Sequence, residues 1–257
     1  MNRFSLAVFV FSHCHDPLEK LCSIYNLDSE IIQNDNVFKV CILSVNTTSD
    51  DTDDVVRQGI DALSSLYNHL KEQGVTEFNI KVDIEVIVTD GDETPIPGIV
   101  LPADFISLAS YLDAQTRFHL MIKSSTQKGM INSGSYLYIM SDDEIDEPIL
   151  NRVAGTQPSI IYRKGHMGRY TVVDFNSWGI EIYLEKQLPD NAALALMNRL
   201  QDPKKIGLYC KDNNYTSHVD LTCYSIPYES IHFNLETSFF TFLRDLSVQY
   251  LELDFMT

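Results

Sequence analysis

The chain has 257 residues, of which 44% are hydrophobic, and its 36 Asp and Glu against 19 Lys and Arg give a net charge of −17. A chain of this length can bury a substantial core without disulfides or structural metals. The negative charge makes direct binding to nucleic acid or to an anionic membrane surface unfavourable, because such binding is driven by Lys and Arg. A partner is therefore expected to be a basic protein.

The cysteines and the first apolar run indicate a reducing, cytoplasmic location. The five cysteines are odd in number and scattered, and most lie in apolar runs, where a reduced thiol acts as a small hydrophobic side chain. The run at residues 4–11 is too short for the core of a signal peptide and lacks a small-residue cleavage site. No other stretch approaches the roughly 18 apolar residues of a membrane span. We expect a cytoplasmic protein without membrane contact.

Apolar runs and alternation predict strands along the whole chain. In chain order these are residues 4–11, 37–45, 78–88, 118–122, 136–140, 159–163, 170–175, 179–185, 206–210, 218–226 and 251–255. Helical spacing separates several of them. The predicted helices are residues 16–25, 55–73, 103–114, 191–200 and 238–248. The first begins with Asp16-Pro17, an N-cap followed by a proline that fits the first helical turn.

Two distant segments share one apolar rhythm. Residues 101–112 align without a gap on residues 235–246, an offset of 134 residues. An internal duplication would produce this match, and so would chance pairing of two amphipathic helices. We predict an α+β fold with two related halves, each a mostly antiparallel or mixed sheet with helices on one face.

The predicted boundaries follow from this reading. An N-terminal half spans residues 1–123 and a C-terminal half spans residues 158–257. Residues 124–157 hold glycines, prolines and an acidic run, a composition typical of a surface connection between two units.

No segment carries a convincing catalytic or metal-binding pattern. His13-Cys14-His15-Asp16 contains metal-ligand types, but no partner motif supplies the remaining ligands. Residues 129–134 have the glycine spacing of a phosphate loop, yet Ser135 and Tyr136 follow where Lys and Ser or Thr are needed. No serine lies in a Gly-x-Ser-x-Gly elbow. We therefore predict no catalytic, cofactor-binding or metal-binding residue, no cofactor and no enzymatic activity.

The acidic residues are clustered in turn-like segments. Asp53 and Asp54 precede a predicted helix, where the positive end of the helix dipole favours them. Two other runs have no comparable local role, so they are candidate partner-binding segments, with tyrosines on a neighbouring strand as aromatic anchors. The candidate residues are Asp90, Asp92, Glu93, Asp142, Asp143, Glu144, Asp146, Glu147, Tyr136 and Tyr138.

The repeated pattern of a strand, a Leu-x-x-x-Phe-x-x-Leu helix and a short strand resembles a small α/β domain of unknown function found in immunity proteins of bacterial polymorphic toxin systems. The residues that carry the resemblance are Leu101, Phe105, Leu108 and Leu112, with Leu235, Phe239, Phe242 and Leu246. The resemblance implies a bacterial immunity protein that binds a cognate toxin and occludes its basic surface. It implies no binding residue, because these are core positions.

Two other functions remain open. One is an acidic nucleic-acid mimic or phage-defence modulator, which should spread paired rows of carboxylates along a surface. The other is an uncharacterised enzyme, which would require a pocket lined by His13, His15 or His166 with a carboxylate nearby.

Overall fold

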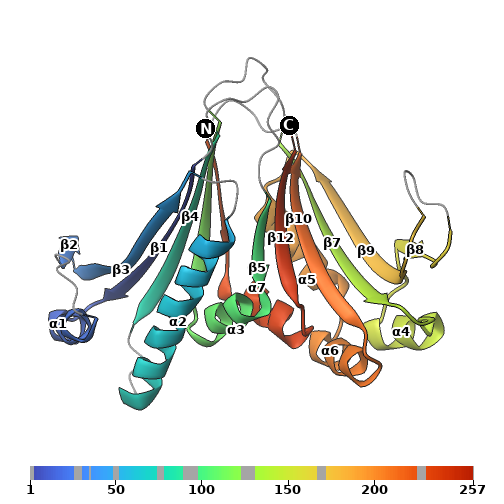
Figure 1. Cartoon of the computed structure of the whole chain (residues 1–257), viewed down its shortest axis with the longest axis horizontal. Helices are drawn as coiled ribbons and strands as arrows, with labels where there is room; N and C mark the ends of the chain where they lie inside the picture. The colour runs from blue at the N-terminus through green and yellow to red at the C-terminus, as the bar shows by residue number, and fades with distance from the viewer. Residues whose placement is uncertain are drawn as a thin grey trace. The chain divides into compact units, whose positions relative to one another are not determined.

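The computed structural model describes residues 3–25, 31–34, 36–48, 52–73, 78–88, 98–122, 131–166, 172–224 and 230–256. These residues form seven helices and two six-stranded sheets (Figure 1), which confirms the predicted α+β class. The chain divides into two compact units. Unit 1 comprises Met1–Thr94, Ser107–Gln127 and Tyr228–Thr237, and unit 2 comprises Pro95–Ile106, Lys128–Pro227 and Ser238–Thr257.

Sheet 1, in unit 1, has the strand order β11-β6-β4-β1-β3-β2. Its strands are β1 (Arg3–Ser12), β2 (Ile32–Asn34), β3 (Val37–Thr47), β4 (Asn79–Val88), β6 (Gln115–Ile122) and β11 (Ile231–Leu235). The sheet is mixed, because β1 is antiparallel to β3 and β4 whereas β4 is parallel to β6.

Helices of unit 1 cover one face of sheet 1. Alternate residues of β1, among them Leu6 and Val8, are fully buried, as expected for a strand with one covered face. Helix α2 (Asp53–Gln73) packs on that face, and a Cβ at Gly59 would lie only 2.9 Å from Leu6 Cδ1, so the glycine permits the close approach. Helix α1 (His15–Ile24) contacts β1 and β3. The opposite face of the sheet carries half-buried residues such as Phe9 and Phe11.

Sheet 2, in unit 2, has the order β5-β12-β10-β7-β9-β8. Its strands are β5 (Ile99–Pro102), β7 (Asn132–Ser141), β8 (Ile160–Tyr162), β9 (Asn176–Glu185), β10 (Thr216–Tyr224) and β12 (Tyr250–Met256). Helix α5 (Pro189–Arg199) contacts β7, β9 and β10. Its Ala192 and Leu196 are buried, as are Leu137 of β7 and Val219 of β10. Helices α4 (Glu147–Ala154) and α6 (Pro203–Asp212) contact each other.

The two sheets correspond strand by strand. When the two strand orders are aligned from their edge strands β11 and β5, the remaining strands pair by position: β6 with β12, β4 with β10, β1 with β7, β3 with β9 and β2 with β8. Helices α3 (Ala103–Tyr111) and α7 (Thr237–Asp245) occupy equivalent places, and Phe105 and Phe239 are each the buried third residue of their helix. This shared strand order is the arrangement that an internal duplication would produce.

Each sheet takes one edge strand from the other half of the sequence. Strand β5 pairs with β12 in sheet 2, although it belongs to the predicted N-terminal half, and β11 pairs with β6 in sheet 1. The units are therefore discontinuous in sequence, unlike the predicted halves 1–123 and 158–257. Residues 124–157, expected to form a surface connection, contain α4 and the internal strand β7. The strand predicted at residues 136–140 is therefore longer than expected, because Ser133, Gly134 and Ser135 interrupt the apolar pattern at its start.

A second difference concerns residues 206–210, which were predicted as a strand but lie in α6. The helix begins at Pro203 after Asp202, whose Oδ1 accepts a hydrogen bond of 3.0 Å from Lys205 N. Strands β2, β5 and β11 were not predicted. Residues 170–171 of another predicted strand lie outside the described residues, and Val172 forms only an isolated bridge.

Candidate functional site

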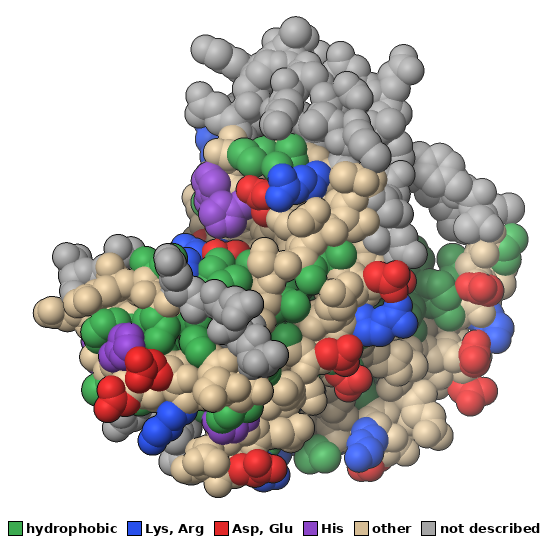
Figure 2. Space-filling view, turned by 60° about the vertical axis from the view of Figure 1, so that its left-hand side comes forward, with side chains coloured by type: hydrophobic (Ala, Val, Ile, Leu, Met, Phe, Trp, Pro, Cys, Tyr) green, Lys and Arg blue, Asp and Glu red, His purple; other side chains and the backbone are tan. Residues whose placement is uncertain are grey.

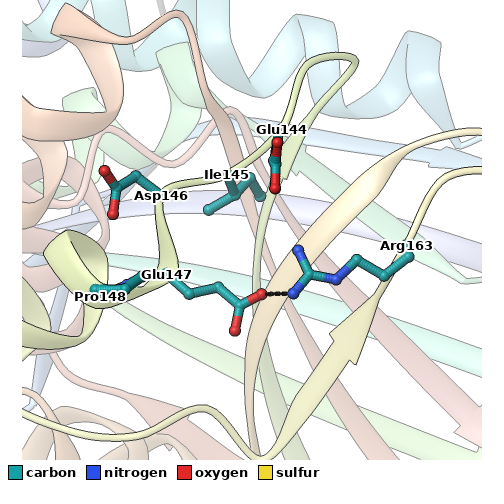
Figure 3. A pocket seen from close by; sticks show the side chains of 6 residues that line it. All are labelled: Glu144, Ile145, Asp146, Glu147, Pro148 and Arg163. Carbon is teal, nitrogen blue, oxygen red and sulfur yellow. Dashed lines mark hydrogen bonds and ion pairs between the residues drawn. The ribbon is translucent and has the colours of Figure 1, made fainter.

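Asp142–Glu147, here called the acidic turn, connects β7 to α4 and lines a surface hollow of about 440 Å³. The hollow is lined by Glu144, Ile145, Asp146, Glu147, Pro148 and Arg163 (Figure 3). Glu147 reaches across it to form an ion pair with Arg163. The hollow therefore contains carboxylates together with one cation of the same unit.

Most of the acidic turn has a structural role, contrary to the sequence interpretation. Asp146 is the N-cap of α4, and its Oδ1 accepts a 3.1 Å hydrogen bond from Ile149 N. Asp142 Oδ1 lies 3.5 Å from Lys164 Nζ, and Glu147 pairs with Arg163. The carboxylates of Asp143 and Glu144 are exposed and form no hydrogen bond or ion pair with the described residues. These two are the part of the turn available to a partner.

Tyr136 and Tyr138 lie on the face of sheet 2 opposite to α5, here called the open face of sheet 2. Side chains alternate along a strand, so the buried odd-numbered residues of β7 meet the helices and these tyrosines point away from them. The neighbouring strands place other polar and aromatic residues on the same face. The open face comprises Tyr136, Tyr138, Glu181, Tyr183, His218, Asp220, Tyr224, Tyr250, Glu252 and Asp254.

Aromatic rings form a row along this face. The ring centroids of Tyr138 and His218 are 5.0 Å apart, and those of His218 and Tyr250 are 4.9 Å apart in a stacked arrangement. Tyr136 stacks at 6.2 Å on Tyr138 and shares a hydroxyl hydrogen bond with Tyr224. Burial raises the pKa of Tyr136 and of Tyr138, so both hydroxyls stay protonated at neutral pH.

Three carboxylates lie beside this row on two adjacent strands. In the sheet register, Asp220 of β10 is opposite Glu252 of β12, and Thr222 is opposite Asp254. Burial, together with the charges of Glu252 and Asp254, raises the pKa of Asp220 to about 7. Burial also raises the pKa of Glu252 and of Asp254. Crowding and burial therefore disfavour full ionisation of the cluster.

None of the described residues provides a cationic side chain that compensates the negative charge of these carboxylates. Asp220 Oδ1 is buried without a hydrogen-bond partner, and the nearest basic atom, His218 Nε2, is 3.8 Å away. Burial lowers the pKa of His218 to about 4, so the imidazole is neutral at pH 7. The two side chains are only 12% and 19% exposed, which limits solvation of the carboxylate. The open face of sheet 2 is thus an anionic site lined by aromatic rings.

Such a site is suited to a guanidinium or ammonium group. A cation placed against the carboxylates gains charge-assisted hydrogen bonds, and neighbouring ring faces attract it further. The sequence analysis found Tyr136 and Tyr138 but missed Asp220, Glu252 and Asp254. A signal was present, because residues 218–224 and 250–254 place polar or aromatic side chains at even positions and mainly apolar ones at odd positions.

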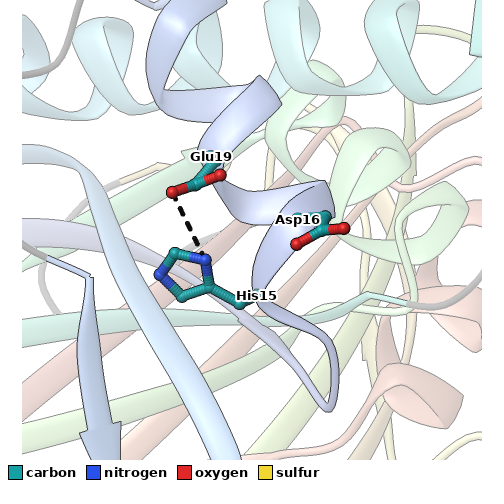
Figure 4. Close-up of side chains that lie close together, drawn as sticks. All are labelled: His15, Asp16 and Glu19. Atoms are coloured by element: carbon teal, nitrogen blue, oxygen red, sulfur yellow. Dashed lines mark ion pairs between the residues drawn. The ribbon is translucent and has the colours of Figure 1, made fainter.

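The remaining sequence candidates lie elsewhere. Asp90, Asp92 and Glu93 lie outside the described residues. At the start of α1, His15 with Asp16 and Glu19 brings three potential ligand atoms within 4.8 Å of one another (Figure 4). His15 Nδ1 is 3.4 Å from Glu19 Oε1, a usual contact between residues four positions apart on a helix. Acidic residues at a helix start have a local explanation in the helix dipole, so this cluster is not by itself evidence of a metal.

The enzymatic alternative depended on a histidine-lined pocket. A second hollow extends along α4 and past its C-terminal end, and it is lined by Pro148, Asn151, Arg152, Gly155, Thr156 and Gln157. Among the described residues, neither this hollow nor the one at the acidic turn includes His13, His15 or His166.

Comparison with known proteins adds no assignment, since no protein-family model and no curated protein matches the sequence. Within the described segments, none of the helices combines the length and the apolar character needed to cross a membrane.

Proposed function

We propose that the protein binds a basic protein, such as a toxin effector, and neutralises it by covering the partner's cationic surface with the open face of sheet 2. The observation that carries this proposal is the group of Asp220, Glu252 and Asp254, which is partly buried and has no cationic partner among the described residues. The resemblance of the α3 and α7 segments to immunity proteins agrees with such a role.

The energetics of the cluster favour a cationic ligand. Like charges and partial burial make the ionised cluster costly in the free protein. A Lys or Arg from a partner removes that cost and supplies the missing hydrogen bonds, so part of the binding energy comes from relieving an unfavourable free state. Tyr138 and Tyr250 add large ring surfaces next to the charge, the combination typical of interface hot spots.

The arrangement favours a protein partner over mimicry of a nucleic acid. Across the sheet, the row through Asp220 runs from Glu252 to Asp220, Tyr136 and Glu181, so a tyrosine interrupts the carboxylates. A mimic of a phosphate backbone would be expected to repeat the charge without such interruption. Aromatic anchors between charges instead suit contacts with protein side chains.

The test is a binding titration with a toxin domain encoded beside the gene for this chain. We expect Asp220→Asn combined with Glu252→Gln to weaken binding by at least about tenfold, because each substitution removes a charge facing the cation without changing side-chain size. The matched control, Asp61→Asn with Asp212→Asn, removes the same total charge from exposed helix positions. Equal loss in both double variants would assign the effect to net charge and reject the open face of sheet 2 as the binding surface.

A further inference from the structure

The edge strand β11 brings two histidines together on the surface of unit 1. His232 of β11 is directly opposite His119 of β6, and the two Nδ1 atoms are 2.7 Å apart. Their ring centroids are 4.5 Å apart and the ring planes meet at 79°. His119 is half-buried and His232 is exposed. In the space-filling view, histidine side chains gather at the surface next to acidic and basic ones (Figure 2).

A hydrogen bond and the sheet register fix the surroundings of this pair. His232 Nε2 lies 2.9 Å from Ser230 Oγ, a contact that orients the ring through its second nitrogen. Glu85 of β4 occupies the next position in the same cross-strand row, opposite His119. The neighbouring cation, Arg117, is held by Asp83 in a two-bond ion pair of 2.6 and 2.7 Å, so its charge is compensated.

We propose that His119 and His232 form a chelating site for a divalent transition-metal ion such as Zn²⁺. Imidazole nitrogens bind such ions at about 2.0–2.1 Å, so two nitrogens on one ion lie roughly 3 Å apart. The observed separation of 2.7 Å, at which the two imidazoles share one hydrogen bond in the metal-free chain, is close to that spacing. An ion that replaces the shared proton would be bound by both Nδ1 atoms. The contact of His232 with Ser230 matches the outer hydrogen bond that orients metal-binding histidines.

Metal binding at this site should also stabilise sheet 1. An ion bound by both histidines links β6 to the strand contributed by the C-terminal part of the chain, so it should stabilise the pairing of β11. Sequence patterns did not indicate the pair, because the two residues are 113 positions apart. The inference lies in unit 1 and is independent of the function proposed for sheet 2.

Isothermal titration of the metal-stripped full chain with ZnCl₂ tests the proposal. We expect one high-affinity ion per chain and a loss of affinity of about tenfold or more in His119→Gln and in His232→Gln, since each removes one of two nitrogen ligands. The matched control is His15→Gln, which alters the cluster of His15, Asp16 and Glu19 and should leave this binding unchanged.

Two further measurements distinguish loss of metal binding from loss of folding. Circular dichroism shows whether each variant is folded, and Co²⁺ added in place of Zn²⁺ gives visible bands that report nitrogen ligation. Zn²⁺ should raise the thermal midpoint of the wild type and not of the His119 or His232 variants. The proposal is overturned if the wild type binds no ion in the micromolar range, or if the ion is lost in His15→Gln and retained in His232→Gln.

Discussion

At the scale of single residues, the open face of sheet 2 combines features that a folding core normally avoids. Asp220 has a buried carboxylate oxygen without a partner, and His218 has a buried Nδ1 without one. Buried polar groups are usually satisfied, since each unpaired group costs about 1–3 kcal/mol. A surface selected only for stability would not retain both, so the cost is consistent with a binding role.

The charge of Asp220 leads to a prediction about stability. Its pKa is raised to about 7 in the fold from an ordinary value of 3.8, so folding favours the protonated acid. The stabilising contribution is complete below about pH 4 and is lost as the pH rises through 7. Asp220→Asn should therefore raise the free energy of unfolding at pH 8, by about 1–2 kcal/mol after allowance for solvent screening, and change it little at pH 4.

Thermal unfolding at the two pH values measures this difference. Asp212→Asn, at an exposed position near the end of α6, serves as the control and should show no such pH dependence. A lower midpoint for Asp220→Asn at pH 8 would mean that the carboxylate has a favourable partner in the folded protein.

At the scale of elements, the acidic turn shows where sequence patterns were sufficient and where they were not. Asp146 is the N-cap of α4 and Pro148 lies in its first turn, a helix start that the sequence analysis interpreted as a partner-binding segment instead. Asp16 and Pro17 correctly indicated α1, but the predicted N-cap was wrong, because the helix begins at His15 and Cys14 occupies the N-cap position. The apolar run 206–210 was wrongly predicted as a strand, because the cap at Asp202 that begins a helix there was not recognised. Short elements depend on their caps more than on their periodicity.

The turn also leads to a kinetic prediction. If the partner is basic, exposed carboxylates near the binding face should accelerate association more than they tighten the complex. We expect Asp143→Asn with Glu144→Gln to slow association severalfold at low salt, and the deficit to shrink near 0.5 M salt, where the screening length falls to roughly 4–5 Å. Asp146 is left intact, because losing its cap would cost about 1 kcal/mol of stability.

A stopped-flow salt series against the basic partner provides the measurement. The fold should be unaffected, since neither side chain forms a hydrogen bond or ion pair with the described residues. An unchanged association rate at low salt would separate the acidic turn from the binding surface.

At the scale of the whole molecule, the sequence predicted an α+β fold and two related halves but not the exchange of edge strands. The match between residues 101–112 and 235–246 aligns α3 with α7, and Phe105 and Phe239 are buried at the same position of the two helices. Strands β5 and β11 have only four and five residues, too few for a periodic signal. Which sheet a short strand joins depends on contacts far apart in the chain, and one sequence does not reveal them.

The exchange predicts that the two halves of the sequence complement each other. A fragment of residues 1–127 lacks β11, and a fragment of residues 128–257 lacks β5. We expect each fragment alone to unfold at lower denaturant, and an equimolar mixture to form a 1:1 complex with a sharper transition, because each supplies the edge strand that the other sheet lacks.

Size-exclusion chromatography of the mixture shows whether the complex forms, and urea unfolding shows whether the complex is more stable than the separate fragments. Removing residues 231–235 from the second fragment should weaken the complex. Fragments that stay separate and unfold cooperatively at the same denaturant as the full chain would show that the exchanged strands contribute little.

The position of β11 in the sequence also matters while the chain is being made. Five of the six strands of sheet 1 lie within the first 122 residues, whereas the sixth begins at Ile231. A ribosome adding roughly 5–20 residues per second needs several more seconds to reach it. Throughout that interval β6 presents an unpaired backbone edge, the type of surface through which nascent chains aggregate. Codon usage or chaperone binding during synthesis of residues 123–230 should therefore influence the yield of folded protein more than codon usage or chaperone binding near the N-terminus.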